Sequence, residues 1–171
     1  MQLSSQRLIL EPLAIPHAEK LHQGLSDLAL HKFVPNDPLS LDALAERYGR
    51  ILCGSRGDNI DLWRNWAVRL AGGKNIGIVE TSVYPGDYAY LAYFMFAPHQ
   101  RQGFAHEACA IVLAHVHQTY AVKRVVAEMD VRNAASWRLV ESLGFVRTGI
   151  RLNADFFKGE SSDEYHYELT L

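Results

Sequence analysis

The middle of the sequence contains three β-rich runs, which limit the folds open to this chain. The runs span residues 66–71, 76–84 and 90–96, and glycine-containing turn segments at 72–75 and 85–87 separate them. Turn segments this short join neighbouring strands that run in opposite directions. We therefore predict an antiparallel meander at the centre of the domain.

Helix and strand signals flank this meander on both sides. Before it, residues 7–12 alternate as a strand does, and residues 15–30 and 40–52 show the apolar spacing of amphipathic helices. After it, the same criteria predict a helix at 105–120, a strand at 125–131, a helix at 134–143 and a strand at 165–171. This order and the short connections predict a single domain over residues 1–171, with an α+β fold around a mixed, mostly antiparallel sheet.

The composition is that of an ordinary globular domain without a strong charge bias. The chain has 171 residues, of which 49% are hydrophobic and 21% are charged, and its formal net charge is −2. Such a balance gives no global electrostatic reason to bind nucleic acid or an anionic membrane surface. The sequence shows neither a signal peptide nor an apolar span of about 18 residues, so we expect no secretion and no membrane insertion.

The cysteines and histidines do not indicate disulfide or metal chemistry. Cys53 and Cys109 lie far apart and form no disulfide framework, which suits a reducing cytoplasm. Cys109 belongs to the apolar face of the helix at 105–120, so we interpret it as a buried residue rather than a thiol nucleophile. His115 and His117 point to nearly opposite sides of the same helix, so we expect no metal site.

The segment that follows the meander has the features of an anion-binding site. A strand ends at Phe96, Pro98 breaks it, and a short loop with Gly103 leads into the helix at 105–120. A helix N-terminus directs free backbone N–H groups and the positive end of its dipole at one point, which suits a phosphate group. Gly103 allows the backbone to approach an anion closely, and Arg101 adds positive charge. The alternative interpretation is a plain connection between a strand and a helix.

Two motifs in this region resemble those of a known enzyme superfamily. They read QxxGxA at residues 100–105 and NxxSxRLxExLGF at residues 133–145, where Asn133 suits an N-cap and Gly144 a helix C-terminus. Their order and separation resemble the GNAT superfamily of N-acetyltransferases. The segment SSQRLILEPLAIPHAEKLHQGLSD at residues 4–27 is similar to the opening of the branch that contains ribosomal-protein alanine N-acetyltransferases, so the resemblance covers nearly the whole chain.

The resemblance implies helices on both faces of the central sheet and acetyl-coenzyme A as the acyl donor. In that family one strand splays from its neighbour and its unpaired backbone binds the pantetheine arm; the matching residues here are Phe94, Met95 and Phe96. The residues that match the pyrophosphate loop, in which main-chain amides do most of the binding, are Gln100, Arg101, Gln102, Gly103, Phe104 and Ala105. Asn133 matches a side chain that contacts pantetheine; its other interpretation is an N-cap, and the two roles are compatible.

The resemblance assigns only part of the acyl-transfer machinery. Transfer to an amine needs a hydrogen-bond donor for the developing oxyanion and a proton donor for the leaving thiolate. Many relatives have a tyrosine acid at the position of Val140, which has no proton to donate. Ser136 matches the serine proposed for this role in the ribosomal-protein branch, with support of the helix cap as the alternative. The implied oxyanion donor is the backbone N–H near Phe96.

Two carboxylates are candidates for the group that removes the proton from the amine. Asp155 matches a glutamate proposed as the base in the ribosomal-protein branch, although its side chain is one methylene shorter. Glu80 lies on the strand that precedes the splayed one. Each has the alternative interpretation of a surface carboxylate, and a chain of water molecules is a third route for the proton.

We therefore predict an N-acetyltransferase that moves an acetyl group from acetyl-coenzyme A to a primary amine, directly and in a ternary complex. The predicted acceptor is the N-terminus of a peptide or protein. The first alternative is a small-molecule amine such as a polyamine, an amino acid or an aminoglycoside. The second is a non-catalytic coenzyme A-binding regulatory module, which Val140 and the lack of a carboxylate at 90–96 favour. A homodimer is compatible with the sequence.

Overall fold

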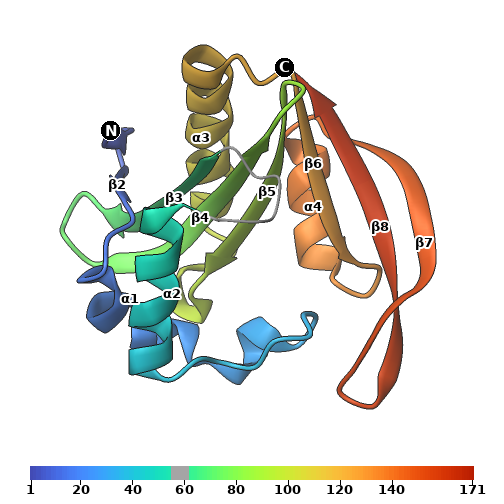
Figure 1. Ribbon diagram of the computed structural model, residues 1–171, viewed down its shortest axis with the longest axis horizontal. Helices are drawn as coiled ribbons and strands as arrows, with labels where there is room; N and C mark the ends of the chain where they lie inside the picture. The colour runs from blue at the N-terminus through green and yellow to red at the C-terminus, as the bar shows by residue number, and fades with distance from the viewer. Residues whose placement is uncertain (55–61) are drawn as a thin grey trace.

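The computed structural model describes residues 1–54 and 62–171, which form a central sheet with helices against both of its faces (Figure 1). The strands are β1 (Leu3–Ser4), β2 (Leu8–Pro12), β3 (Leu62–Leu70), β4 (Asn75–Tyr84), β5 (Tyr88–Met95), β6 (Arg124–Asp130), β7 (Val146–Phe157) and β8 (Glu160–Thr170). The helices are α1 (His17–Leu25), α2 (Leu41–Cys53), α3 (Phe104–Tyr120) and α4 (Ala134–Ser142), with 3₁₀ turns at Leu28–His31 and Ala97–His99.

The predicted mixed, mostly antiparallel sheet is confirmed. Its strands lie in the order β1-β2-β3-β4-β5-β6-β8-β7. All neighbouring pairs are antiparallel except β5 and β6, which are parallel. A parallel pair needs a long crossover connection, and α3 provides it between these two strands. The predicted meander corresponds to β3, β4 and β5, with β3 starting at Leu62, earlier than expected.

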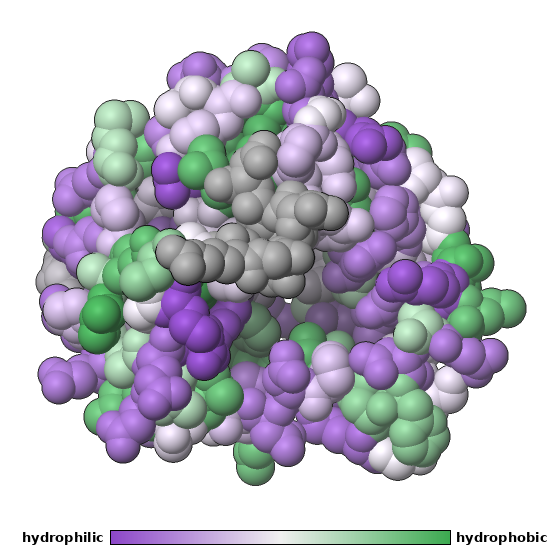
Figure 2. Space-filling view, viewed as in Figure 1, coloured by the Kyte–Doolittle hydropathy of each residue, from purple (hydrophilic) through white to green (hydrophobic). Residues whose placement is uncertain are grey.

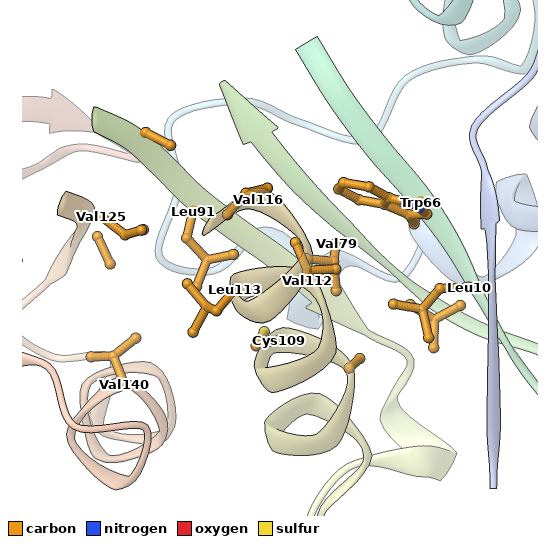
Figure 3. Packing of buried hydrophobic residues seen from close by; sticks show 14 of the residues in the cluster. Leu10, Trp66, Val79, Leu91, Cys109, Val112, Leu113, Val116, Val125 and Val140 are labelled. Atoms are coloured by element: carbon orange, nitrogen blue, oxygen red, sulfur yellow. The ribbon is translucent and has the colours of Figure 1, made fainter. Parts of the chain in front are cut away.

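Two hydrophobic clusters attach the helices to opposite faces of the sheet. The larger cluster joins α3 and α4 to one face (Figure 3), and its buried members include Val68, Val79, Cys109, Val112, Val116 and Val140. The smaller cluster joins α1 and α2 to the other face, and its members include Leu21, Leu44, Tyr48, Ala67 and Ile78. Each fully buried Val or Leu stabilises the fold by about 1.5–3 kcal/mol, so both faces contribute to holding the sheet in place.

The structure places the two cysteines in different surroundings. Cys53 is exposed at the end of α2, whereas Cys109 is buried, as predicted, and burial raises the pKa of its thiol. Within residues 1–54 and 62–171, no group of three or more His, Cys, Asp or Glu side chains is arranged to hold a metal ion. In the same ranges, no helix combines the length and the apolar character needed to cross a membrane.

The prediction of one helix over residues 15–30 is wrong in its second half. α1 ends at Leu25, and a separate 3₁₀ turn follows. The Ser26 hydroxyl donates to a carbonyl oxygen one turn earlier (2.7 Å), and the Asp27 carboxylate accepts from the N–H of Ala29 (2.9 Å). Short polar side chains that bond to nearby backbone groups compete with the helical hydrogen bonds, so the chain leaves the helix here.

Strand β7 is the longest element that the sequence pattern did not predict, and the two-residue strand β1 was also not predicted. Strand β7 pairs with β8, and most of its side chains are exposed, so it lacks the alternation of apolar and polar residues by which a half-buried strand is recognised. The last strand also begins earlier than predicted, at Glu160 rather than at residue 165. The long β7–β8 hairpin therefore extends the sheet beyond the part that the helices cover (Figure 1).

Close packing of β4 against β5 generates a stability prediction. A Cβ atom added at Gly77 would lie 2.3 Å from the carbonyl oxygen of Phe94. We expect Gly77→Ala to lower the free energy of unfolding by about 1–3 kcal/mol, because the two strands must move apart. For a domain of this size the melting temperature falls by about 2–12 °C. Gly72→Ala, whose Cβ would meet no atom within 4 Å, is the control. Equal melting temperatures for the two variants, measured by circular dichroism, would contradict the packing.

Candidate functional site

The parallel strands β5 and β6 splay apart, as predicted. Their register has three residue pairs and ends where Tyr90 lies opposite Val126. Beyond this point β5 stays paired with β4 up to Met95, and β6 stays paired with β8 up to Asp130. We call the region between these diverging segments, residues 91–95 and 127–130, the splay (Figure 1).

Alternate residues of β5 direct their backbone groups toward β4 or toward the splay. The N–H of Phe96 donates to the carbonyl oxygen of Ile76 (2.8 Å), and Phe94, two residues earlier, also has its backbone directed at β4. Tyr93 and Met95 therefore present their N–H groups to the splay. The N–H of Phe96 is engaged in the sheet, whereas the neighbouring N–H of Met95 is directed away from β4 and toward the splay.

The loop between β5 and α3 ends in free backbone donors. Arg101 and Gly103 have left-handed φ angles of 59° and 80°. The helix begins at Phe104, and the N–H of Glu107 donates to the carbonyl oxygen of Gly103 (3.0 Å) as its first intrahelical bond. The N–H groups of residues 104–106 precede that bond, so they have no acceptor inside the helix and are available to an anion.

Two glutamine side chains fasten this loop to its own backbone. The amide nitrogen of Gln100 donates to the carbonyl oxygen of Met95 (2.9 Å), and that of Gln102 donates to the carbonyl oxygen of Pro98 (2.9 Å). Because both side chains are engaged in this way, the donors that the loop offers to a ligand are its main-chain amides and the exposed side chain of Arg101.

Arg7, directly before β2, braces the loop from outside. Its Nη1 donates to the carbonyl oxygen of Gln102 (3.2 Å), its Nε donates to Glu107 (2.7 Å), and its guanidinium lies 4.6 Å from the centroid of the Phe104 ring. Burial alone would raise the pKa of Glu107, but hydrogen bonds from Ser5 and Arg7 hold it below its ordinary value. This brace could not be predicted from the sequence, because contacts so distant along the chain leave no local pattern.

The N-terminus of α4 carries Ser136 and faces β5. Asn133 is the N-cap, since its Oδ1 accepts from the N–H of Ser136 (3.2 Å). The hydroxyl of Tyr93 lies 3.1 Å from both the Oγ and the carbonyl oxygen of Ser136. Val140 is fully buried in the larger cluster. Tyr93 does not stand out in the sequence as a site residue, because an aromatic residue in a strand is commonly part of the core.

Glu80 lies on the opposite face of the sheet, beneath α2. Its carboxylate accepts hydrogen bonds from Arg47 of α2 (3.0 Å) and Asn65 of β3 (3.3 Å). A cavity of about 110 Å³ lies beside these groups, and Tyr90 and Ala92 of β5 form part of its lining. Glu80 is therefore next to the splayed strand.

Asp155 lies near the far end of β7, opposite Ser162 of β8. It is exposed, and its Oδ1 accepts from the N–H of Phe156 (2.7 Å). The tip of the hairpin reaches the connection between α1 and α2, where Lys158 donates to the carbonyl oxygen of Val34 (2.9 Å). Asp155 thus belongs to a segment that crosses toward the α1–α2 side of the molecule.

The candidate groups are divided between the two faces of the sheet. Tyr93 meets Ser136 on the face of α4, whereas Glu80 lies on the face of α2. In the described ranges no hydrogen bond joins Ser136 to Glu80 or to Asp155. Figure 2 shows the α2 side of the molecule, which is hollowed below its centre between the helical part and the β7–β8 hairpin. Strand β5, on one side of the splay, contributes to both places, since Tyr90 and Ala92 line the cavity beside Glu80 and Tyr93 contacts Ser136.

Comparison with known proteins agrees with this geometry. A family model described as an acetyltransferase (GNAT) domain matches residues 7–146. A curated relative, the uncharacterized N-acetyltransferase YnaD of Bacillus subtilis (strain 168), is 23% identical over 176 residues. The match covers 99% of this chain and 96% of that protein.

Solved structures of acetyltransferases have the same fold. The acetyl transferase of Salmonella typhimurium that modifies the N-terminal serine of ribosomal subunit protein L7/L12 is 20% identical, with a TM-score of 0.87 over 100% of this chain and 99% of that one. Spermidine N-acetyltransferase of Vibrio cholerae, solved with CoA and spermine, is 22% identical, with a TM-score of 0.84 over 97% and 96% of the two chains. At these identities the likeness establishes only the fold of this chain. The ribosomal protein and spermidine are named as the acceptors of those two enzymes.

The left-handed conformation of Gly103 generates a binding prediction. A side chain here strains the backbone and projects beside the free amides, so we expect Gly103→Glu to weaken the binding of acetyl-coenzyme A at least about tenfold. Gly73→Glu is the matched control, since Gly73 also has a left-handed φ (99°) but lies in the β3–β4 turn with no atom within 4 Å of its added Cβ. Calorimetric titration compares both folded variants with the parent. If Gly103→Glu binds acetyl-coenzyme A with unchanged affinity, the loop is not part of the binding site.

Proposed function

We propose, from the premise that this chain belongs to the acetyltransferase (GNAT) domain family, that it acetylates the N-terminal amine of a peptide or protein. Membership of the family makes the chain an acetyl-coenzyme A-dependent N-acetyltransferase. The observation that carries the acetyl-coenzyme A-dependent part of the proposal is the splay, which leads into a loop of free amides at the N-terminus of α3. An extended arm that ends in phosphate groups fits both parts at once.

The donor substrate, acetyl-coenzyme A, matches the chain at two points. The backbone of Tyr93 and Met95 offers hydrogen bonds along the splay, where the pantetheine arm can pair as a further strand would. The amides of residues 104–106, with the charge of Arg101, suit the pyrophosphate. Gly103 has no side chain, and a Cβ added there would lie 3.5 Å from Nη2 of Arg7. When bound, the donor supplies the thioester carbon that an amine attacks.

Catalysis in this proposal depends on two donors at the splay. The N–H of Met95 donates to the thioester oxygen as it gains negative charge, and a donor already fixed in the sheet needs no reorganisation. The hydroxyl of Ser136 donates to the sulfur as the carbon–sulfur bond breaks. Ser136 lies in the first turn of α4, where the positive end of the helix dipole also favours developing negative charge.

The base is proposed to be a carboxylate on the acceptor side. The family resemblance favours Asp155, whose exposed carboxylate lies on the hairpin that crosses toward the α1–α2 connection. Glu80 is favoured by its position beside a cavity next to β5. Glu80 is already held by Arg47 and Asn65, so it must exchange or share these hydrogen bonds to take a proton. We therefore keep Asp155 as the first assignment and Glu80 as the second.

The acceptor is proposed to enter through the hollow on the α2 side (Figure 2). A flexible N-terminus fits such an open approach, and the Salmonella neighbour modifies an N-terminal serine of a ribosomal protein. An acceptor of this kind would place the reaction in the cytoplasm. The carboxylate of Glu80 beside a cavity of about 110 Å³ favours a second candidate, a small cationic amine.

The experiment that tests the proposal measures release of free thiol from acetyl-coenzyme A with a panel of acceptors. We expect turnover with peptides that have a free N-terminus and none with the same peptides after N-terminal blocking, with the acetyl group located by mass spectrometry. Turnover only with spermidine or free amino acids would support the small amine instead. Tight binding of the donor without turnover on any acceptor would support the non-catalytic alternative.

The two carboxylates generate a further prediction, tested by Asp155→Asn and Glu80→Gln with one acceptor. Loss of a general base costs about 10²–10⁴ in rate, whereas loss of a surface carboxylate costs almost nothing. We expect Asp155→Asn to reduce kcat/KM by that factor and to flatten its acidic limb, with partial recovery at high pH. The acceptor's own ionisation gives a similar limb, so the difference between the variants decides. If Asp155→Asn keeps the wild-type kcat/KM and its dependence on pH, Asp155 is not the base. If only Glu80→Gln loses activity, Glu80 is the base instead.

A further inference from the structure

The hydroxyl of Tyr93 is a partly buried polar group to which the proposed chemistry assigns no role. Among the described residues, its single hydrogen has two acceptors within reach, the Oγ and the carbonyl oxygen of Ser136, each at 3.1 Å. The carbonyl group of Ser136 lies inside α4, where the helical ladder supplies a donor. The Oγ is therefore the atom whose properties this contact changes most.

Donation from Tyr93 constrains where the hydrogen of Ser136 points. A serine hydroxyl has one hydrogen and two lone pairs, so a donor that occupies one lone pair turns the hydrogen toward a different acceptor. Hydrogen bonds in such a chain polarise one another, which makes the second hydroxyl a better donor. Burial raises the pKa of Tyr93 above its ordinary value, so it keeps its proton throughout the neutral range.

We propose that Tyr93 is a positioning residue that orients and polarises the hydroxyl of Ser136 toward the sulfur of the leaving group. This inference rests on the proposed function, because it assigns Ser136 to the sulfur. Tyr93 belongs to the strand whose backbone faces the splay, and Ser136 lies across from it at the start of α4. The two hydroxyls thus form a short chain that ends where the thiolate develops.

The chain stabilises charge without losing a proton. As the amine nitrogen bonds to the thioester carbon, the carbon–sulfur bond breaks and its electron pair remains on sulfur. The nitrogen loses a proton to the base, and the sulfur takes up a proton from solvent to give the free thiol. Ser136 and Tyr93 end the reaction with the hydrogens they began with, which avoids a buried phenolate or alkoxide.

A purely structural role for Tyr93 would be to tie β5 to α4, and the chain contains a matched control for it. Tyr167 of β8 is fully buried, and its hydroxyl donates to Glu141 of α4 (2.8 Å). Tyr167→Phe removes a tie between a strand and the same helix without touching Ser136. Tyr93→Phe removes one hydroxyl in the same way, but from the proposed chain.

The test measures the rate of acyl transfer in a single turnover, with the enzyme saturated by acetyl-coenzyme A and by the best acceptor. We expect Ser136→Ala and Tyr93→Phe each to slow this step about 5- to 100-fold, and Tyr167→Phe to leave it unchanged. In the Ser136→Ala background, Tyr93→Phe should have little further effect, because its contribution passes through Ser136. Donor affinity and melting temperature should stay close to those of the parent in Tyr93→Phe.

A second donor separates positioning from packing. The selenium analogue of acetyl-coenzyme A has a less basic leaving group, so it needs less help from a hydrogen-bond donor. The deficits of Tyr93→Phe and Ser136→Ala should therefore shrink together with this donor, whereas a packing defect would persist. Full rate in Tyr93→Phe, or an undiminished Tyr93→Phe effect in the absence of the Ser136 hydroxyl, overturns the inference. If the parent enzyme acetylates no amine, the proposed function fails instead.

Discussion

The early end of the parallel pairing between β5 and β6 is the constraint on which the site depends. Parallel strands require a crossover, and α3 provides it by starting beyond the end of β5 and returning to the start of β6. Because pairing stops at Tyr90 and Val126, the N-terminus of α3 lies at the open end of the splay. One backbone arrangement therefore places strand-like hydrogen-bonding groups and a cluster of free amides along a single path.

Unpaired backbone groups and left-handed residues are costly, so the surrounding structure must hold them. The hydrophobic cluster beneath α3 fixes the helix on the sheet, and Arg7 links the start of β2 to both the loop and Glu107. Arg101 keeps a left-handed φ of 59° that a non-glycine residue adopts at some energetic cost. The loop can keep this strained conformation because the elements on either side of it, β5 and α3, are fixed by their own packing and hold its two ends in place.

Local patterns predicted most of the fold, and their failures have physical causes. The meander, the helices and the anion-binding loop each have a short-range signal in the sequence: turn residues, helical spacing of apolar residues, and Gly103, respectively. β7 carries none, because exposed side chains on an outer strand need not alternate. The end of α1 depends on the side chains of Ser26 and Asp27, which also occur within helices. In the site, Arg7 and Tyr93 act through contacts distant in sequence, which only the fold brings together.

The division of the site between two faces favours direct transfer over a covalent enzyme intermediate. The groups assigned to the donor sulfur lie on the face of α4. Both candidate bases lie toward the α1–α2 side, Glu80 beneath α2 and Asp155 on the hairpin that reaches the α1–α2 connection, so donor and acceptor can approach the splay from different sides. A covalent route would need a nucleophile at the same place. Cys109 is fully buried on the apolar face of α3, and burial raises the pKa of its thiol, which opposes formation of the reactive thiolate. Polarising Ser136 through Tyr93 serves the departing sulfur, whereas an attacking serine would need a base to remove its proton.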